Sequence, residues 1–150
     1  MSSSTPARRM TGIGRVLVIV YAIMALAATG RSFVQIVRDF DAAPLAYSLS
    51  ALAALVYIVA TLALILAARP AWYAVAWIAI GFELIGVLAV GTLSIVVPEL
   101  FQHQTVWSLF GIGYLFVPLV LPFFGLWWLL THRPVASPAP TGDASAPVTA

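Results

Sequence analysis

Four long apolar runs constrain this chain more than any other feature of its sequence. They cover residues 13–29, 45–68, 72–97 and 106–130. A helix rises about 1.5 Å per residue, so about 20 apolar residues cross the roughly 30 Å hydrocarbon core of a bilayer. The runs are apolar on all sides, whereas the strands of a membrane barrel alternate between apolar and polar residues. The sequence therefore predicts an all-α protein with four transmembrane helices.

The composition agrees with a chain surrounded by lipid. Hydrophobic residues make up 63% of the 150 residues and charged residues only 8%, whereas about a quarter of a typical soluble domain is charged. We expect the lipid bilayer to be the main partner of this chain. Its seven basic and five acidic residues are too few and too scattered to attract nucleic acid. The absence of cysteine excludes disulfides and thiolate metal sites.

Prolines lie where helices are expected to begin or end. Pro44 precedes the second apolar run, Pro70 precedes the third, and Pro98 follows it, and proline is tolerated at the start of a helix but not in its interior. The connections between the runs are therefore short. We predict an antiparallel four-helix transmembrane bundle.

The bundle is predicted to occupy residues 13–132. Residues 1–12 form a cytoplasmic N-terminal segment in this prediction. Residues 133–150 are rich in Pro, Ala and Ser and are predicted to form a disordered cytoplasmic tail.

The arginines predict the orientation, because basic residues near helix ends favour the cytoplasmic side. With the N-terminus inside, Arg31 and Arg38 lie outside and five arginines lie inside: Arg8, Arg9, Arg15, Arg69 and Arg133. Both termini are therefore expected in the cytoplasm of a multi-pass protein of the cell membrane. Aromatic residues favour membrane interfaces, which predicts Trp72, Tyr73, Trp127 and Trp128 at the inner interface and Phe40, Tyr47, Phe101 and Trp107 at the outer one.

The N-terminal region has a second interpretation as a cleaved signal peptide. Arg8 and Arg9 precede an apolar run that ends in the small residues ALAA, which resembles a signal sequence with its cleavage site. Against cleavage, the apolar run continues to Thr29, and RSFVQIVRDF then extends the helix. Cleavage would leave three transmembrane helices in the same orientation.

Glu83 is the most informative single residue, because it lies near the centre of the third apolar run. A carboxylate at the bilayer midplane costs about 2.5 kcal/mol or more, so it must face the bundle, find partners or be protonated. Tyr21 and Tyr57 lie at a similar predicted depth, and Tyr114 lies about one turn further out. We predict an intramembrane polar cluster of Glu83 with these three tyrosines.

Two hypotheses for this polar cluster stay open. In the first, it is a polar clamp that fixes helix packing, at about 0.6 kcal/mol for each interhelical bond. In the second, Glu83 takes up and releases a proton and so couples proton movement to transport. The single intramembrane acid favours the clamp, since transporters usually contain repeats or several ionisable groups along a path.

Helix packing is expected to depend on small residues and prolines. Pro118 and Pro122 leave carbonyl groups of the fourth helix without their usual donors and predict a kink there. Gly81, Gly86 and Gly91 are five residues apart, so they spiral around the third helix and form no GxxxG motif.

A second candidate site lies at the outer face. It contains Arg31, Gln35, Glu99 and His103. Arg31 at the membrane edge is a candidate to pair with Glu99 or with a phosphate, and Glu99 and His103 would be one turn apart if their loop were helical. One such pair is not a metal site, and the alternative is an ordinary solvated loop.

No enzyme motif stands out from the sequence. His103 and His132 lie at opposite predicted surfaces, so they cannot be the two axial ligands of one haem. We find no Ser, His and Asp set that could meet and no glycine-rich phosphate loop after a strand. We expect no catalysis, no metal and no cofactor.

Several segments carry a family resemblance. These are RSFVQI, PLAYSLSALAALVY, GFELIGVLAVGTLS and TVWSLFGIGYLFVPLVLPFFGLWWL, which resemble small four-helix integral membrane proteins of actinobacteria over roughly residues 13–132. The resemblance implies the membrane topology but no activity, cofactor or site residue. The expected role is structural or accessory, with a homo-oligomer or a membrane-protein partner; the alternative is a small proton-coupled carrier or channel that uses Glu83.

Overall fold

The computed structural model describes residues 12–134, and these residues are helical with no strand. The long helices are α1 (Ile13–Asp39), α2 (Pro44–Ile65), α3 (Pro70–Val96) and α4 (Val117–Thr131). Three 3-10 segments connect them: η1 (Phe40–Ala42), η2 (Pro98–Phe101) and η3 (Ser108–Tyr114). The predicted segments 1–12 and 133–150 lie almost entirely outside the described residues.

Three helices are long and apolar enough to cross a membrane. They are α1 with η1, α2 and α3, and a fourth crossing exists only if η3 and α4 together count as one broken span. α1 and α3 have 27 residues each, which corresponds to about 40 Å at 1.5 Å per residue. The prediction of an all-helical protein with long apolar helices is confirmed for the described residues.

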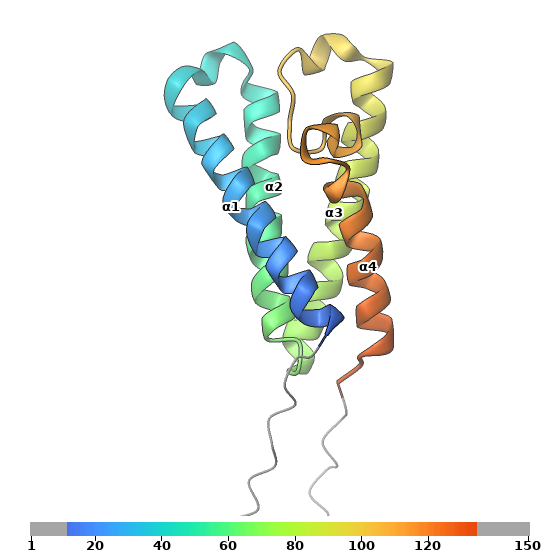
Figure 1. Ribbon diagram of the computed structural model, residues 1–150. Helices are drawn as coiled ribbons and strands as arrows, with labels where there is room; N and C mark the ends of the chain where they lie inside the picture. The colour runs from blue at the N-terminus through green and yellow to red at the C-terminus, as the bar shows by residue number, and fades with distance from the viewer. Residues whose placement is uncertain (1–11, 135–150) are drawn as a thin grey trace, which may run out of the picture.

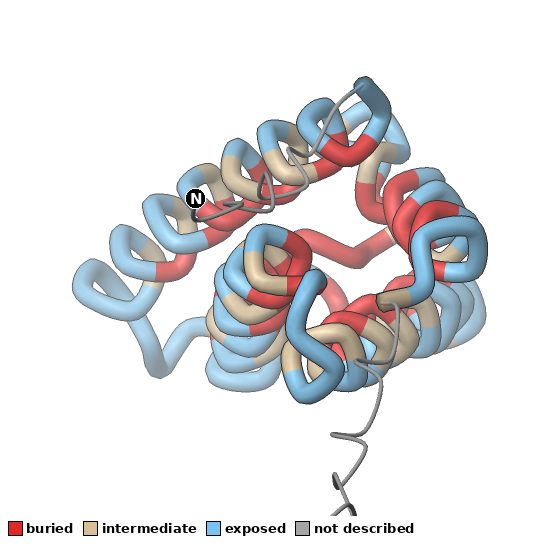
Figure 2. Tube along the Cα trace, turned by 90° about the horizontal axis from the view of Figure 1, so that it is seen from below, coloured by how far each residue is buried: buried red, intermediate tan, exposed pale blue. Residues whose placement is uncertain are grey.

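The helices run up and down beside one another (Figure 1). We call the end of the bundle that carries η1 and η2 the outer end. The opposite end, where α1 begins and α4 stops, is called the inner end. Figure 2 shows that buried residues of each helix face the interior, while exposed residues face away from it. The exposed faces are mostly apolar, and Ile19, Leu26, Ile78 and Ile85 are each more than half exposed. Such faces suit lipid contact.

The helix boundaries follow from local chemistry. Pro44 and Pro70 occupy the first turns of α2 and α3, where the missing N–H costs no helical hydrogen bond. α1 continues without a break through RSFVQIVRDF, as the sequence predicts, and ends at Asp39. The tight α2–α3 connection closes with a hydrogen bond from Arg69 N to Leu66 O of 3.0 Å.

The fourth apolar run differs from its prediction. It was expected to form one helix over residues 106–130, but helix α4 starts only at Val117 and lies at 97° to η3. Pro118 explains this start, because a helix extended by more than one turn before Pro118 would need its missing N–H. Leu109, Phe110 and Gly111 instead have left-handed φ angles of 50°, 59° and 78°.

Pro118 and Pro122, which were expected to kink the fourth helix, do not mark the main bend of the chain. Pro118 lies in the first turn of α4, and Pro122 is inside the helix one turn later. Both prolines are buried. The large change of direction comes before Pro118, between η3 and α4, so the chain breaks at this point where a kinked continuous helix was predicted.

The outer half of the fourth run is thus an irregular chain that enters the bundle. We call residues 102–116 the re-entrant segment, because the chain turns back into the bundle there; the name does not mean a loop that returns to the same side of a membrane. In Figure 1 it descends from the outer end, coils at η3 beside α3, and joins the top of α4. Thr105, Val106, Trp107 and Ser108 in this segment are all buried. Residues 105–108 therefore belong to the core of the bundle, whereas both ends of the segment are exposed.

Candidate functional site

Glu83 lies in the middle of α3 and has no solvent exposure. The Tyr21 hydroxyl on α1 donates a hydrogen bond to Glu83 Oε2 at 2.7 Å. The second carboxyl oxygen, Oε1, is buried and has no hydrogen-bond partner among the described residues. The carboxyl group thus faces the interior of the bundle with only one of its two oxygens bonded.

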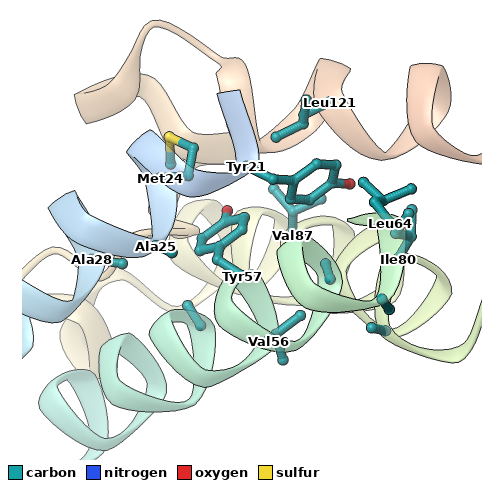
Figure 3. Packing of buried hydrophobic residues seen from close by; sticks show 14 of the residues in the cluster. Tyr21, Met24, Ala25, Ala28, Val56, Tyr57, Leu64, Ile80, Val87 and Leu121 are labelled. Carbon is teal, nitrogen blue, oxygen red and sulfur yellow. The ribbon is translucent and has the colours of Figure 1, made fainter. Parts of the chain in front are cut away.

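Tyr57 on α2 lies beside Tyr21, with ring centroids 6.2 Å apart and ring planes at 50°. The two tyrosines project from neighbouring helices into the same part of the core (Figure 3). Both are fully buried. Their hydroxyls need partners at this depth, because an unpaired buried hydroxyl costs free energy.

Trp107 supplies the partner of Tyr57. Its indole Nε1 donates a hydrogen bond to the Tyr57 hydroxyl at 3.2 Å. The sequence predicts Trp107 at the outer interface; in the structure only 2% of the Trp107 surface is exposed, so the ring packs inside the bundle and does not face its surroundings. The re-entrant segment carries this side chain into the bundle.

The intramembrane polar cluster therefore includes Trp107, which the sequence does not reveal as a member. Tyr114, a predicted member, makes no hydrogen bond in the cluster; it is half-buried and packs against the core. Tyr21, Tyr57, Glu83 and Trp107 come from α1, α2, α3 and the re-entrant segment respectively. Their two hydrogen bonds join α1 to α3 and the re-entrant segment to α2, and α4 takes part in neither.

A short polar turn at residues 105–108 shapes the re-entrant segment where η3 begins. Thr105 N donates to Ser108 Oγ at 2.9 Å, and Ser108 N donates back to Thr105 Oγ1 at 2.9 Å. Trp107 N donates to the same Thr105 oxygen at 3.2 Å. These side chains satisfy main-chain groups that a continuous helix would pair internally. The sequence signal is the Thr-x-x-Ser spacing at 105–108, which resembles a helix cap.

Two glycines of α3 form the surface on which the re-entrant segment packs. An added Cβ at Gly86 would come within 2.8 Å of the Trp107 ring, and one at Gly91 would come within 2.5 Å of the Phe110 ring. A Cβ at Gly81 would meet nothing within 4 Å. The five-residue spacing thus places Gly86 and Gly91, but not Gly81, against the same segment. The spacing is visible in the sequence, but the contact depends on a distant segment and is not.

Within the described residues, the four residues of the predicted outer-face site make no hydrogen bond with one another. The Arg31 Nη2 atom donates to the main-chain carbonyl of Gln104 at 2.7 Å, and this bond replaces the expected pairing with Glu99. Gln35 is half-buried, and its Oε1 atom has no hydrogen-bond partner. Glu99 is in η2, which ends at Phe101 before His103 is reached.

His103 instead contacts α2. Its Nδ1 atom lies 3.4 Å from the Tyr47 hydroxyl, and the two rings meet edge to face with centroids 5.8 Å apart. Residues 12–134 contain no group of three or more His, Asp or Glu side chains placed to hold a metal ion.

The chain was compared with known protein families, with curated proteins and with solved structures, and none of the three comparisons gave a match.

Proposed function

We propose that this chain is a four-span integral membrane protein with both ends on the cytoplasmic side. α1, α2 and α3 are the first three crossings, and the re-entrant segment with α4 is the fourth. Arg15, Arg69 and Arg133 belong to the inner end, whereas Arg31 and Arg38 belong to the outer part of α1. This excess of arginine supports an inner end that faces the cytoplasm.

The proposed role is structural or accessory, with the intramembrane polar cluster as a clamp. The observation that carries this proposal is the pair of buried hydrogen bonds Tyr21–Glu83 and Trp107–Tyr57. Together they tie α1 to α3 and the re-entrant segment to α2. An irregular chain at membrane depth is stable only when protein surrounds it or when it lines water. Holding the re-entrant segment inside the bundle is therefore a structural role that accounts for these buried polar residues.

We propose no catalytic activity and no cofactor for this chain. The partners that we propose are lipid and either a second copy of the chain or another membrane protein. The support is chemical: the exposed apolar faces of α1 and α3 are suited both to lipid and to a neighbouring transmembrane helix.

A second candidate function is a proton-coupled carrier or channel that uses Glu83. The observation that favours it is Glu83 Oε1, which is fully buried without a partner. An acid at the bilayer midplane with a free oxygen can accept a proton or contact a bound cation, and such residues mark ion pathways in many membrane proteins.

Two substitutions at Glu83 separate the two functions. Glu83→Gln keeps a carbonyl oxygen that accepts the Tyr21 hydrogen bond but removes the ionisable group. Glu83→Asp keeps the ionisable group but moves it back by one methylene. We expect Glu83→Gln to stay folded in detergent and Glu83→Asp to be less stable, as a clamp requires. Tyr114→Phe is the matched control, since its hydroxyl makes no hydrogen bond with the cluster.

Proteoliposome measurements complete this test. A pH-sensitive dye inside the vesicles should report the same proton leak for the unchanged chain and for Glu83→Gln. A leak that the unchanged chain supports, that Glu83→Asp retains and that Glu83→Gln abolishes would establish the carrier and defeat the clamp.

The orientation is tested with single cysteines, because the chain contains none of its own. Leu100 in η2 is 55% exposed at the outer end. A membrane-impermeant thiol reagent should label Leu100→Cys from outside intact cells and should label Ala68→Cys at the inner end only after the cells are opened. The reverse pattern would invert the proposed topology.

A further inference from the structure

Buried polar atoms without partners are concentrated at one end of the molecule. Within the part of the chain that the structure describes, these atoms are Arg31 Nε, Ser32 Oγ, Gln35 Oε1, Ser50 Oγ and Glu83 Oε1. The first three belong to the outer part of α1, the fourth belongs to the outer half of α2, and Glu83 is at the centre of α3. The inner half, where α4 packs, contributes none of them. Groups of this kind usually bond to water when protein partners are lacking.

The re-entrant segment lies among these atoms. Its residue Gln104 accepts the Arg31 hydrogen bond through the main-chain carbonyl. Its next turn is irregular, and Leu109, Phe110, Leu115 and Phe116 all have positive φ angles. Left-handed residues other than glycine cost about 1–3 kcal/mol each and persist only where surrounding contacts hold them, and the residues at both ends of this irregular segment, Gln102 to Gln104 and Leu115 to Phe116, are exposed. The outer half is therefore the place where water can enter most easily.

Ser50 shares a face of α2 with two tyrosines that contact the re-entrant segment. Tyr47, Ser50 and Tyr57 share one face of α2, since their spacings of three and seven residues return to nearly the same side of a helix. The first of them contacts His103 and the last contacts Trp107. Ser50 lies between these two contacts, with no solvent exposure and with an unpaired Oγ. On α1, Ser32 follows Arg31 directly, is 4% exposed and is likewise unpaired.

We propose that water enters the outer half of the bundle alongside the re-entrant segment and bonds to Ser32 and Ser50. The ring of Trp107 then separates this water from Glu83, because Trp107 packs on Gly86, nearly one turn outward from the acid. The inner half stays dry. Water thus approaches the midplane acid from the outer end only, and the Trp107 ring lies between the two. This inference rests on the transmembrane arrangement proposed above and adds a route by which water, and protons carried by water, approach the cluster.

Thiol reactivity in single-cysteine variants of the full chain tests this inference. Ser50→Cys and Ser32→Cys are nearly isosteric probes on two different helices. Ala60→Cys is the matched control, because Ala60 is also fully buried on α2 but belongs to its inner half. Leu100→Cys reports the rate of an exposed outer residue. The reagent is a small positively charged methanethiosulfonate added to vesicles that contain the protein.

We expect both serine positions to react at least about tenfold faster than Ala60→Cys, because only a hydrated thiol ionises to the reactive thiolate. They should react from the same side as Leu100→Cys. If both probes are as inert as Ala60→Cys while Leu100→Cys reacts, the inference is overturned. If Leu100→Cys reacts from the cytoplasmic side, the proposed orientation fails, and the ratio of the serine and alanine rates still decides whether the outer half is hydrated.

Discussion

The indole Nε1 of Trp107 donates to the hydroxyl of Tyr57 at 3.2 Å, and both side chains are buried. The two residues are 50 positions apart. This bond holds the re-entrant segment against α2 at the level of the intramembrane polar cluster.

Trp107→Phe and Trp107→Ala should have different effects on stability. The phenyl ring keeps most of the contact with Gly86 but loses the N–H donor, so we expect a loss of about 0.6 kcal/mol, the average for an interhelical hydrogen bond. Alanine also leaves a cavity, for which about 3–5 kcal/mol is typical. Unfolding in mixed micelles with increasing sodium dodecyl sulfate measures both values. A double-mutant cycle with Tyr57→Phe should give additive effects only if the hydrogen bond is absent.

Tyr21→Phe should destabilise the bundle through the lost donor to Glu83. We expect between about 0.6 and 1.7 kcal/mol, the average and the maximum for such bonds in a membrane. Tyr114→Phe should change the stability little, since that hydroxyl makes no bond with the cluster. Equal losses for the two variants would show that Tyr21 does not bond to Glu83. The same unfolding titration serves for both.

Gly86→Ala and Gly91→Ala should both loosen the re-entrant segment. A Cβ at Gly86 meets the Trp107 ring at 2.8 Å, and one at Gly91 meets the Phe110 ring at 2.5 Å. Overpacking of this kind costs about 1–3 kcal/mol. Gly81→Ala is the control on the same helix, since its Cβ meets nothing within 4 Å. A loss for Gly81→Ala as large as for the other two would argue against the packing described.

Gly111→Ala should be more harmful than Gly113→Ala. Gly111 has a φ angle of +78°, and an added Cβ would come within 2.6 Å of the Pro118 ring. A left-handed alanine alone costs about 1–2 kcal/mol, and the clash adds to it. At Gly113 the nearest atom is Gln104 Oε1 at 3.9 Å. Limited proteolysis of the detergent-solubilised protein should show faster cleavage in the re-entrant segment of the Gly111 variant alone.

The first three helices and the inward direction of Glu83 could be predicted from the sequence. Whether a run of 20 or more apolar residues enters lipid depends on its own composition and length. An acid in the middle of such a run must avoid lipid whatever its neighbours are. Both conclusions follow from local chemistry, and the proline positions defined the starts of α2 and α3 for the same reason.

The tertiary structure decided what residues 102–116 do. Residues 106–116 belong to an apolar run that predicts a helix, but Trp107 and Phe110 find complementary surfaces on Gly86 and Gly91, and Tyr57 offers an acceptor to the indole. These contacts come from distant parts of the chain, so no local pattern reveals them. The same holds for Arg31, whose partner is a main-chain carbonyl brought to it by the re-entrant segment. Membrane insertion is a property of each segment alone, whereas the site depends on which segments meet.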